Sequence, residues 1–310
     1  MKLSNNTENL KKRKTGFKEG IVERNLGYIL LAPAVITIGI IAIFPILKTF
    51  WYSLFDMQLQ NITSPRFIGI DNYIKLSQDT TFLQSLRNTV YFSVLSVILE
   101  LLIGFIAALL MDLKFKGRAF LRATILIPWA IPGIIIALIF QYMFNDRLGI
   151  INVMLIKFHL INSPVLWLGT KGYAMWSVIV VDVWKQVPFM ALILVAGLQM
   201  IPKELYESCD VDGATYLEKL FYITIPQMKP VIMVALLFRT MGAFKVFDTI
   251  YGLTGGGPGN STSSISVYAY KTLFNDLDFG YGSTIAIATF VIIFILCLGY
   301  IKLLGTEKED

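Results

Sequence analysis

The stretch ELYESCDVDGATYLEKLFYITIP, residues Glu204 to Pro226, places five carboxylates and an Asp-Gly pair between two long apolar runs. The residues from Glu204 to Val211 favour a short helix. This helix can begin at Pro202, because proline is tolerated in the first turn. The Asp212-Gly213 pair is expected to stop it, since Asp-Gly is a common turn sequence.

A second short helix is predicted directly after this turn. Thr215-x-x-Glu218 has the spacing of a capping box, in which the side chains and backbone at a helix start bond reciprocally. Apolar residues then recur at helical spacing, and Pro226 is expected to end the unit. An exposed helix this short is marginal in water alone, so its apolar stripe predicts a groove on a cytoplasmic partner protein. The stripe consists of Leu217, Leu220, Phe221 and Thr224.

An alternative for this acidic insert is a segment lying flat on the membrane surface. Interfacial helices of that kind usually carry basic polar faces, which anionic lipid attracts. The insert is acidic, so anionic lipid would repel it. A protein partner is the favoured interpretation.

The rest of the chain has the composition of a membrane protein. Of its 310 residues 55% are hydrophobic and 15% are charged, and the mean hydropathy is +0.66. Soluble domains average about 25% charged residues. The net charge of +6 comes without a compact basic domain, which argues against nucleic-acid binding. We therefore predict an all-α polytopic protein of the cell membrane, embedded in the lipid bilayer.

Six runs are apolar and long enough to span a bilayer as helices, which requires about 20 residues each. The domain interpretation is an N-terminal tail over 1–26, a six-helix transmembrane domain over 27–304 that includes the insert 204–226, and a C-terminal tail over 305–310. Pro128, Pro132 and Pro188 are expected to kink their spans. The predicted spans are about 27–50, 87–111, 123–144, 173–197, 229–250 and 283–304.

Lysine and arginine give the predicted orientation, because cytoplasmic loops of membrane proteins carry an excess of both. With six spans the two tails and the insert lie on one side, and sixteen Lys and Arg residues fall there. Six fall on the opposite side. Both termini and the insert are therefore predicted to be cytoplasmic.

Several chemistries find no support in the sequence. His159 is the only histidine, and Cys209 and Cys297 have no metal-ligand spacing, so neither a catalytic residue nor a metal site is predicted. The run GGGPGN, Gly255 to Asn260, lacks the Lys of a phosphate-binding loop, so no nucleotide site is predicted on this chain. No cofactor is expected on this chain.

Charged residues inside the spans are candidates for a substrate pathway, since intramembrane charge is costly and usually marks function or helix pairing. Glu100, Asp182, Lys185 and Arg239 fall near the middles of predicted spans. Asp182 and Lys185 are three residues apart and are placed to pair on one helix face. Pairing between helices is an equally weighted alternative. The pathway candidates are Glu100, Asp182, Lys185, Phe244, Asp248 and Tyr251.

The insert and four further motifs resemble one transporter family. Glu207-Ser-Cys-x-x-Asp212-Gly213-Ala214, with eleven residues between Ala214 and Pro226, is similar to the E-A-A-x-x-D-G-A signature of permeases from ABC importers, and most similar to the maltose and multiple-sugar type. Ser208 and Cys209 replace two alanines, and Leu220 stands where phenylalanine is usual. The other motifs are FIGIDNY (67–73), LIPWAIPG (126–133), LGIIN with LWLG (148–152 and 166–169) and FDTIYGLTGGGPGNST (247–262).

This resemblance implies a type I importer transmembrane domain that forms half of a pore for a sugar or oligosaccharide. It implies a second homologous permease chain, an extracytoplasmic binding protein, and two ATPase subunits that use ATP and Mg. The insert would then couple to an ATPase cleft. The coupling residues would be Glu204, Glu207, Asp212, Gly213, Ala214, Thr215, Leu217, Leu220 and Phe221.

Two alternatives remain open. The same architecture is compatible with a permease for another solute, such as a polyol or glycerol phosphate. An ion-gradient-driven secondary transporter usually shows internal repeats with broken helices at matching positions. The two halves of this chain show no evident match, and the acidic insert would have no purpose in such a protein.

Overall fold

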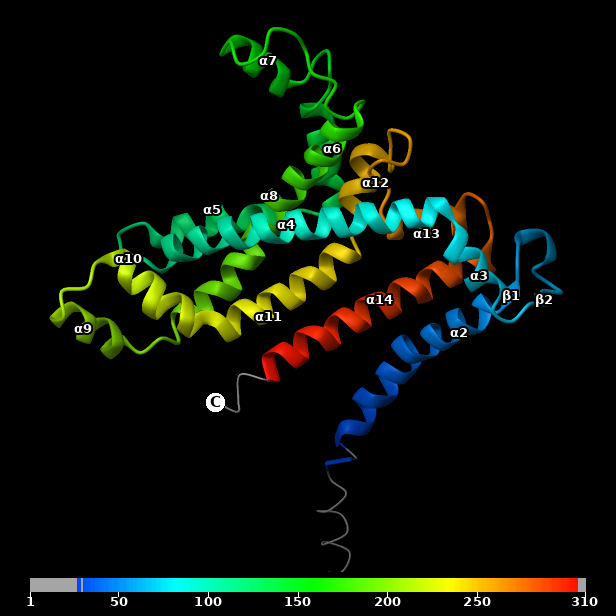
Figure 1. Cartoon of the computed structure of the whole chain (residues 1–310), viewed down its shortest axis with the longest axis horizontal. Helices are drawn as coiled ribbons and strands as arrows, with labels where there is room; N and C mark the ends of the chain where they lie inside the picture. Colours follow the sequence, from blue (N-terminus) through cyan, green and yellow to red (C-terminus); the bar gives the residue numbers. More distant parts are fainter. Residues whose placement is uncertain (1–26, 29, 306–310) are drawn as a thin grey trace, which may run out of the picture. The chain divides into compact units, whose positions relative to one another are not determined.

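The computed structural model describes residues 27–28 and 30–305, most of which are helical (Figure 1). The α-helices are α2 (Phe44–Ser53), α3 (Asp71–Gln78), α4 (Thr80–Asp112), α5 (Arg118–Ala130), α6 (Gly133–Met143), α7 (Ile150–Lys157), α8 (Lys171–Leu198), α9 (Lys203–Val211), α10 (Tyr216–Lys219), α11 (Ile225–Phe244), α12 (Asp248–Thr254), α13 (Ile265–Phe274) and α14 (Phe279–Gly305). The other elements are η1 (Gly39–Ile43), η2 (Leu59–Asn61), η3 (Leu220–Thr224), β1 (Phe55–Asp56) and β2 (Arg66–Phe67).

The chain divides into two compact units, residues 1–52 and 53–310. The described part of the first unit is mainly an apolar helix that begins at Leu30 and continues through η1 into α2. None of the residues in its most apolar stretch is buried within the chain. A helix with such a surface requires nonpolar surroundings, which agrees with the predicted first span.

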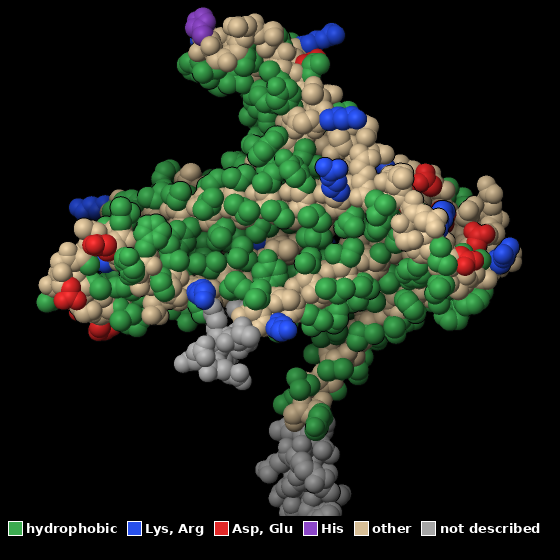
Figure 2. Space-filling view, viewed as in Figure 1, with side chains coloured by type: hydrophobic (Ala, Val, Ile, Leu, Met, Phe, Trp, Pro, Cys, Tyr) green, Lys and Arg blue, Asp and Glu red, His purple; other side chains and the backbone are tan. Residues whose placement is uncertain are grey.

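In the second unit α4 and α8 pack along one another, and α11 lies against α4, α8 and α14 (Figure 1). One apolar core joins α4, α8 and α12 through Phe92, Val178 and Ile250. A second core joins α8 to α11 through Met190 and Met228. Figure 2 shows hydrophobic side chains covering much of the outer surface of these helices. That surface is suited to lipid.

Five helices are long and apolar enough to cross a membrane, and the count rises to six if one bent pair is taken as a single span. The bent pair is α5 with α6, which meet at an angle of 93°. The predicted third span, 123–144, is therefore a broken helix. Ile131 is extended because it precedes Pro132, and this geometry ends α5. Pro132 thus interrupts its span as predicted, while Pro128 and Pro188 lie inside continuous helices.

The fifth span differs from the prediction at both ends. Helical structure runs from Tyr216 through η3 to Phe244, so Pro226 does not end the insert. Pro226 lies inside this helical run, where the π-helical turn η3 passes into α11. The span also stops at Phe244 rather than near residue 250, because the chain turns before the separate helix α12.

Candidate functional site

The acidic insert folds into α9 and α10, with a turn at Gly213. The φ of Gly213 is +74°, a left-handed conformation that glycine adopts without a Cβ penalty. The backbone N–H of Ala214 donates to the Cys209 carbonyl at 2.9 Å and closes the turn. A Cβ at Gly213 would meet no atom within 4 Å, so the backbone angle alone favours glycine there. The predicted turn is confirmed.

The predicted capping box is present at the start of α10. A carboxylate oxygen of Glu218 accepts hydrogen bonds from the backbone N–H and the hydroxyl of Thr215, each at 2.7 Å. The Thr215 hydroxyl oxygen in turn accepts from the backbone N–H of Glu218 at 3.4 Å. These bonds satisfy polar groups that a helix start leaves without partners.

Two side-chain contacts fasten α9 to the helix that follows it. Lys219 forms an ion pair with Asp210 of α9. The hydroxyls of Tyr206 and Thr224 share a hydrogen bond of 2.9 Å. Because η3 continues directly into α11, both contacts connect α9 to the start of a membrane-spanning helix. The insert is therefore braced against that helix.

The structure divides the predicted apolar stripe. Leu217 and Phe221 are 62% and 61% exposed, whereas Thr224 is buried. Leu220 lines a cavity of about 400 Å³ between the end of α4 and the insert. The stripe is therefore not one exposed surface, since only half of it is free for another protein. The other predicted coupling residues are exposed, with Ala214 partly covered: Glu204, Glu207, Asp212, Gly213 and Thr215.

A buried ion cluster of Glu100, Asp182 and Arg239 joins three helices in the interior of the second unit. The guanidinium of Arg239, on α11, donates two parallel hydrogen bonds to Glu100 of α4, one of them 2.8 Å long from Nη2 to Oε1. Arg239 also pairs with Asp182 of α8. The hydroxyl of Thr249, on α12, donates to the second oxygen of Asp182 at 3.2 Å.

The side chains of the ion cluster are almost completely buried. Glu100 has no exposed surface, and Asp182 and Arg239 are 2% and 4% exposed. Buried ions of this kind persist only when they are paired, because removal of one partner leaves an uncompensated charge at a cost of about 3–5 kcal/mol. The ion cluster therefore fixes α11 against α4 and α8.

The predicted pairing of Asp182 with Lys185 is wrong. Both oxygens of Asp182 are occupied by groups from other helices, Arg239 and Thr249. Among the residues that the structure describes, Lys185 forms no ion pair with Asp182. Lys185 is close to Asp182 along the helix, but Asp182 pairs with the guanidinium of Arg239 instead. The planar fork of a guanidinium matches a carboxylate better than an ammonium does.

A polar cavity of about 200 Å³ lies beside the ion cluster, and we call it the inner cavity. Lys185 and Asp248 approach each other across Gly133, at the start of α6. A Cβ at Gly133 would lie 2.8 Å from Nζ of Lys185 and 2.9 Å from Oδ2 of Asp248, so only glycine fits there unchanged. The lining residues are Asp182, Lys185, Gln186, Arg239, Gly242, Lys245, Val246, Phe247, Asp248 and Thr249.

The remaining pathway candidates lie in different surroundings. Phe244 is 6% exposed. Tyr251 is 37% exposed, and its ring stacks on that of Phe247 with centroids 5.0 Å apart. Tyr270 of α13 packs edge-on against Tyr251 at 5.1 Å. The structure thus places three of the six candidates, Asp182, Lys185 and Asp248, in the lining of the inner cavity, and Tyr251 in an aromatic group beside it.

Sequence reasoning missed Gly133 and Thr249 as members of this region. Gly133 closes the LIPWAIPG motif, and its position directly after a proline was the available signal. Thr249 gave no signal, because a threonine in an apolar run is common. No group of three or more His, Cys, Asp or Glu side chains suited to a metal ion occurs in the described part of the chain.

The chain is similar to known transport proteins over most of its length. The profile of the family "Binding-protein-dependent transport system inner membrane component" matches residues 100–304. The trehalose/maltose transport system permease protein MalF of Thermococcus litoralis is 43% identical over 288 residues, which cover 93% of this chain and 96% of that protein. The trehalose transport system permease protein SugA of Mycobacterium tuberculosis H37Rv is 34% identical over 289 residues, 92% of this chain and 90% of that one.

Among solved structures, one chain of a bacterial ABC transporter involved in the import of the acidic polysaccharide alginate superposes with a TM-score of 0.80. The alignment covers 94% of this chain and 99% of that chain, at 24% sequence identity. At this identity the likeness concerns the fold alone. This chain therefore shares the fold of that transporter chain.

Proposed function

The chain belongs to the family of binding-protein-dependent transport system inner membrane components, and we propose that it forms half of the translocation pathway of an ATP-driven sugar importer. It is a transport subunit and not an enzyme. The observation that carries this proposal is the continuous helix from Tyr216 to Phe244. This helix joins an exposed, braced insert at one end to the buried ion cluster at the other.

The insert supplies the contact with an ATPase subunit. Its exposed surface combines the apolar side chains of Leu217 and Phe221 with the carboxylates of Glu204 and Glu207. A short amphipathic helix of this kind is recognised when its apolar face enters a groove on a partner. ATP and Mg are bound and used by that partner, and this chain contributes the coupling segment.

Movement of the insert reaches the pore through the long helix. About 23 residues separate Tyr216 from Arg239, which corresponds to about 35 Å along a helix axis. Because Arg239 is bonded to α4 and α8, a displacement at the insert is transmitted to the walls of the inner cavity. Closure of two ATPase subunits would thereby shift the helices between inward-facing and outward-facing states.

The substrate pathway passes the inner cavity. Lys185, Lys245 and Asp248 offer hydrogen-bond donors and acceptors there, and Phe247 offers an aromatic face. The relatives named for trehalose and maltose favour a neutral sugar or oligosaccharide as substrate. A second homologous permease chain would form the opposite wall, and an extracytoplasmic binding protein would deliver the sugar.

The decisive experiment separates ATP-driven from ion-driven transport. The chain is reconstituted in vesicles with its second permease, its ATPase subunits and its binding protein, and uptake of labelled maltose and trehalose is measured. Uptake is expected to require ATP and the binding protein and to be insensitive to a proton or sodium gradient. Uptake driven by a gradient without ATP would refute the importer and support a secondary transporter.

The proposed topology places both termini and the insert in the cytoplasm, with six spans, and residues 148–169 outside. Leu148 and Val211 are each 89% exposed, which makes them a matched pair for labelling. In a background with Cys209 and Cys297 replaced by serine, an impermeant thiol reagent applied to intact cells should modify Leu148→Cys and leave Val211→Cys unmodified. The reverse pattern would invert the proposed orientation.

A further inference from the structure

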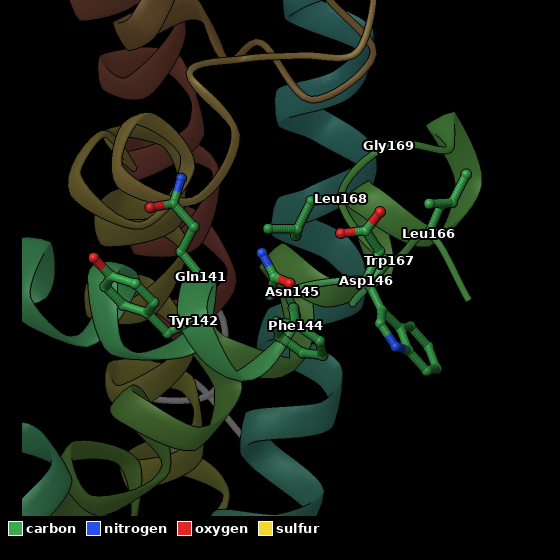
Figure 3. Close-up of a pocket in the computed structure, with 9 residues that line it drawn as sticks. All are labelled: Gln141, Tyr142, Phe144, Asn145, Asp146, Leu166, Trp167, Leu168 and Gly169. Carbon is green, nitrogen blue, oxygen red and sulfur yellow. The ribbon is translucent and has the colours of Figure 1, made fainter. Parts of the chain in front are cut away.

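Another cavity, of about 480 Å³, lies between the end of α6 and the segment before α8, and we call it the lobe pocket. It has no lining residue in common with the inner cavity. In the proposed topology it opens outside the membrane. Figure 3 shows its lining, which comprises Gln141, Tyr142, Phe144, Asn145, Asp146, Leu166, Trp167, Leu168 and Gly169.

Asn152 holds the two sides of the lobe pocket together. Its amide nitrogen donates to the carbonyls of Asp146, at 3.1 Å, and Val165, at 3.0 Å. Its carbonyl oxygen accepts from the Val165 N–H at 3.1 Å and from Nε1 of Trp167 at 2.9 Å. Asn152 is 2% exposed, so these four bonds are protected from water. They explain why LGIIN and LWLG lie together, and they preorganise the pocket.

Three polar side chains at the pocket retain free hydrogen-bonding atoms. Asn145 uses its carbonyl oxygen to accept from the N–H groups of Arg147 and Leu148, at 3.0 and 2.9 Å, and this leaves its amide N–H groups available. The Asp146 carboxylate has no hydrogen-bond or ion-pair partner within the described part of the chain. Gln141 donates weakly to the Leu253 carbonyl at 3.4 Å.

The three polar groups and the apolar wall face the same space. In Figure 3 the side chains of Gln141, Asn145 and Asp146 extend to one side of the ribbon, and Leu168 projects among them. Phe144 and Trp167 pack together below, with ring centroids 5.9 Å apart. The lobe pocket thus combines one carboxylate and two carboxamides with an apolar wall.

We propose that the lobe pocket binds a neutral sugar unit, an inference that rests on the proposed function as a sugar importer. A sugar hydroxyl both donates and accepts hydrogen bonds, so neighbouring hydroxyls match the Asp146 acceptor and the Asn145 donor side by side. Hydrogen bonds to the charged carboxylate are the stronger ones. The C–H faces of the sugar ring would lie against Leu168. A simple cation would bind the Asp146 carboxylate but would leave the amide N–H groups of Asn145, which only donate, without a role.

This site would engage the substrate outside the membrane, apart from the pathway through the inner cavity. A cavity of this volume is within the range of small-molecule sites, which runs from about 300 to 1,000 Å³. One or two sugar units are therefore the expected occupants. An oligosaccharide would present one end to the lobe pocket before it enters the pathway.

Two substitutions test the site with little change of shape. Asp146→Asn removes the charge and leaves the backbone carbonyl that Asn152 holds. Asn145→Asp keeps the oxygen that accepts from Arg147 and Leu148 and removes the amide donor. Asn162→Asp, in the exposed loop before Val165, is the control for an added charge near the lobe pocket. All variants should keep the wild-type thermal unfolding midpoint.

The purified full-length chain, in lipid nanodiscs, is titrated with radiolabelled maltose and trehalose by equilibrium dialysis. We expect saturable binding that weakens about tenfold or more in both variants, a change of about 1.4 kcal/mol. Asp146→Asn loses the charge that strengthens the accepted hydrogen bond, and Asn145→Asp loses the amide donor. Asn162→Asp should bind as wild type does. An absence of saturable binding of both sugars, or unchanged binding in both pocket variants, would overturn the proposal.

A variant of the inner cavity, Asp248→Ala, separates this inference from the proposed function. It should leave binding at the lobe pocket intact. Binding that disappears in Asp248→Ala and persists in the pocket variants would place the sugar in the inner cavity and overturn the lobe site. ATP-driven uptake by the reconstituted importer would then still support the proposed function, so the two failures are distinguishable.

Discussion

The acidic insert and the ion cluster use the same chemical groups in opposite surroundings. Glu204 and Glu207 of the insert are exposed, whereas Glu100 of the ion cluster has no exposed surface. An exposed charge costs little to maintain, and a buried one persists only with a partner. Glu204 and Glu207 are therefore free to meet another protein, while the charges of the ion cluster bind helices of this chain to one another.

The comparison also separates local from long-range structure. The Gly213 turn and the Thr215–Glu218 capping box bring together residues that are at most a few positions apart. The ion cluster joins Glu100 to Arg239, which is 139 positions away. A local motif survives changes elsewhere in the chain, whereas a distant ion pair depends on the packing of every helix between its members. Four substitutions test this difference, from the largest expected effect to the smallest.

Arg239→Leu should have the largest effect. It leaves Glu100 and Asp182 buried without a counter-ion, so the protein should lose about 3–5 kcal/mol of stability. The measurement is the thermal unfolding midpoint in detergent. A triple variant that adds Glu100→Gln and Asp182→Asn should recover much of the loss, because the uncompensated charge is removed. An unchanged midpoint in Arg239→Leu alone would show that the ion cluster does not hold the helices.

Asp79→Asn should have an intermediate effect at neutral pH. Asp79 accepts from the N–H groups of Thr81 and Phe82, at 2.8 and 3.2 Å, and from the hydroxyls of Tyr268 and Tyr281, at 2.5 Å each. Burial raises the pKa of Asp79, but the hydrogen bonds from the two tyrosines and the two N–H groups together lower it below 3.8. The charged form is therefore favoured in the folded protein, and its loss should cost about 2 kcal/mol.

The pH dependence of this difference follows from the lowered pKa. The contribution of Asp79 is complete above the unfolded value near 3.8 and is lost as the pH falls through the lower folded value. The gap between the unfolding midpoints of wild type and Asp79→Asn should thus be constant from pH 5 to 8 and shrink in stronger acid. A gap that grows on acidification would contradict the assigned hydrogen bonds.

Gly213→Val should affect coupling more than stability. A β-branched residue in the left-handed region costs about 1–2 kcal/mol, and the space around Gly213 is open, so the strain is purely local. Gly69→Val is the matched control, because Gly69 has a φ of +59° and equally open surroundings in a different loop. Sugar uptake per ATP should fall in Gly213→Val and not in Gly69→Val. Equal coupling in both variants would remove the insert from the coupling path.

Leu217→Ser should have the smallest effect on the folded chain. Leu217 is 62% exposed, so its replacement should change the stability by no more than about 0.5 kcal/mol. Association with the ATPase should nevertheless weaken, as measured by co-purification. Leu148→Ser, at an 89% exposed position between α6 and α7, should co-purify the ATPase as wild type does. Full retention of the ATPase by Leu217→Ser would place its groove elsewhere.

Features that depend on neighbouring residues were predictable. The apolar runs around α8 and α14 indicated their spans to within a few residues, because a helix in lipid must satisfy its backbone internally, whereas α4 begins at Thr80, before the predicted start at 87. The Gly213 turn and the capping box also followed from sequence, since their partners lie within one turn of helix. Lys185 and Asp248 were selected from the sequence as polar candidates, but their approach to each other across Gly133 was not predicted.

The mistaken predictions concern choices between local and distant partners. Pro226 looked like a terminator, yet the helix continues through it at the junction of η3 and α11. Lys185 looked like the partner of Asp182, yet Arg239 and Thr249 take both carboxylate oxygens. In each case the sequence offered two acceptable structures of similar local energy, and the packing of distant helices selected one.

The sequence by itself determined that this chain is a helical membrane protein with an acidic, turn-containing insert, because hydropathy, turn residues and helix caps act over a few positions. Only the tertiary structure decided that Glu100, Asp182 and Arg239 meet, that Gly133 makes room for Lys185 and Asp248, and that Asn152 ties the two sides of the lobe pocket. Such contacts join residues far apart in the chain. The free energy that they contribute depends on how deeply the groups are buried, and burial results from several helices packing together.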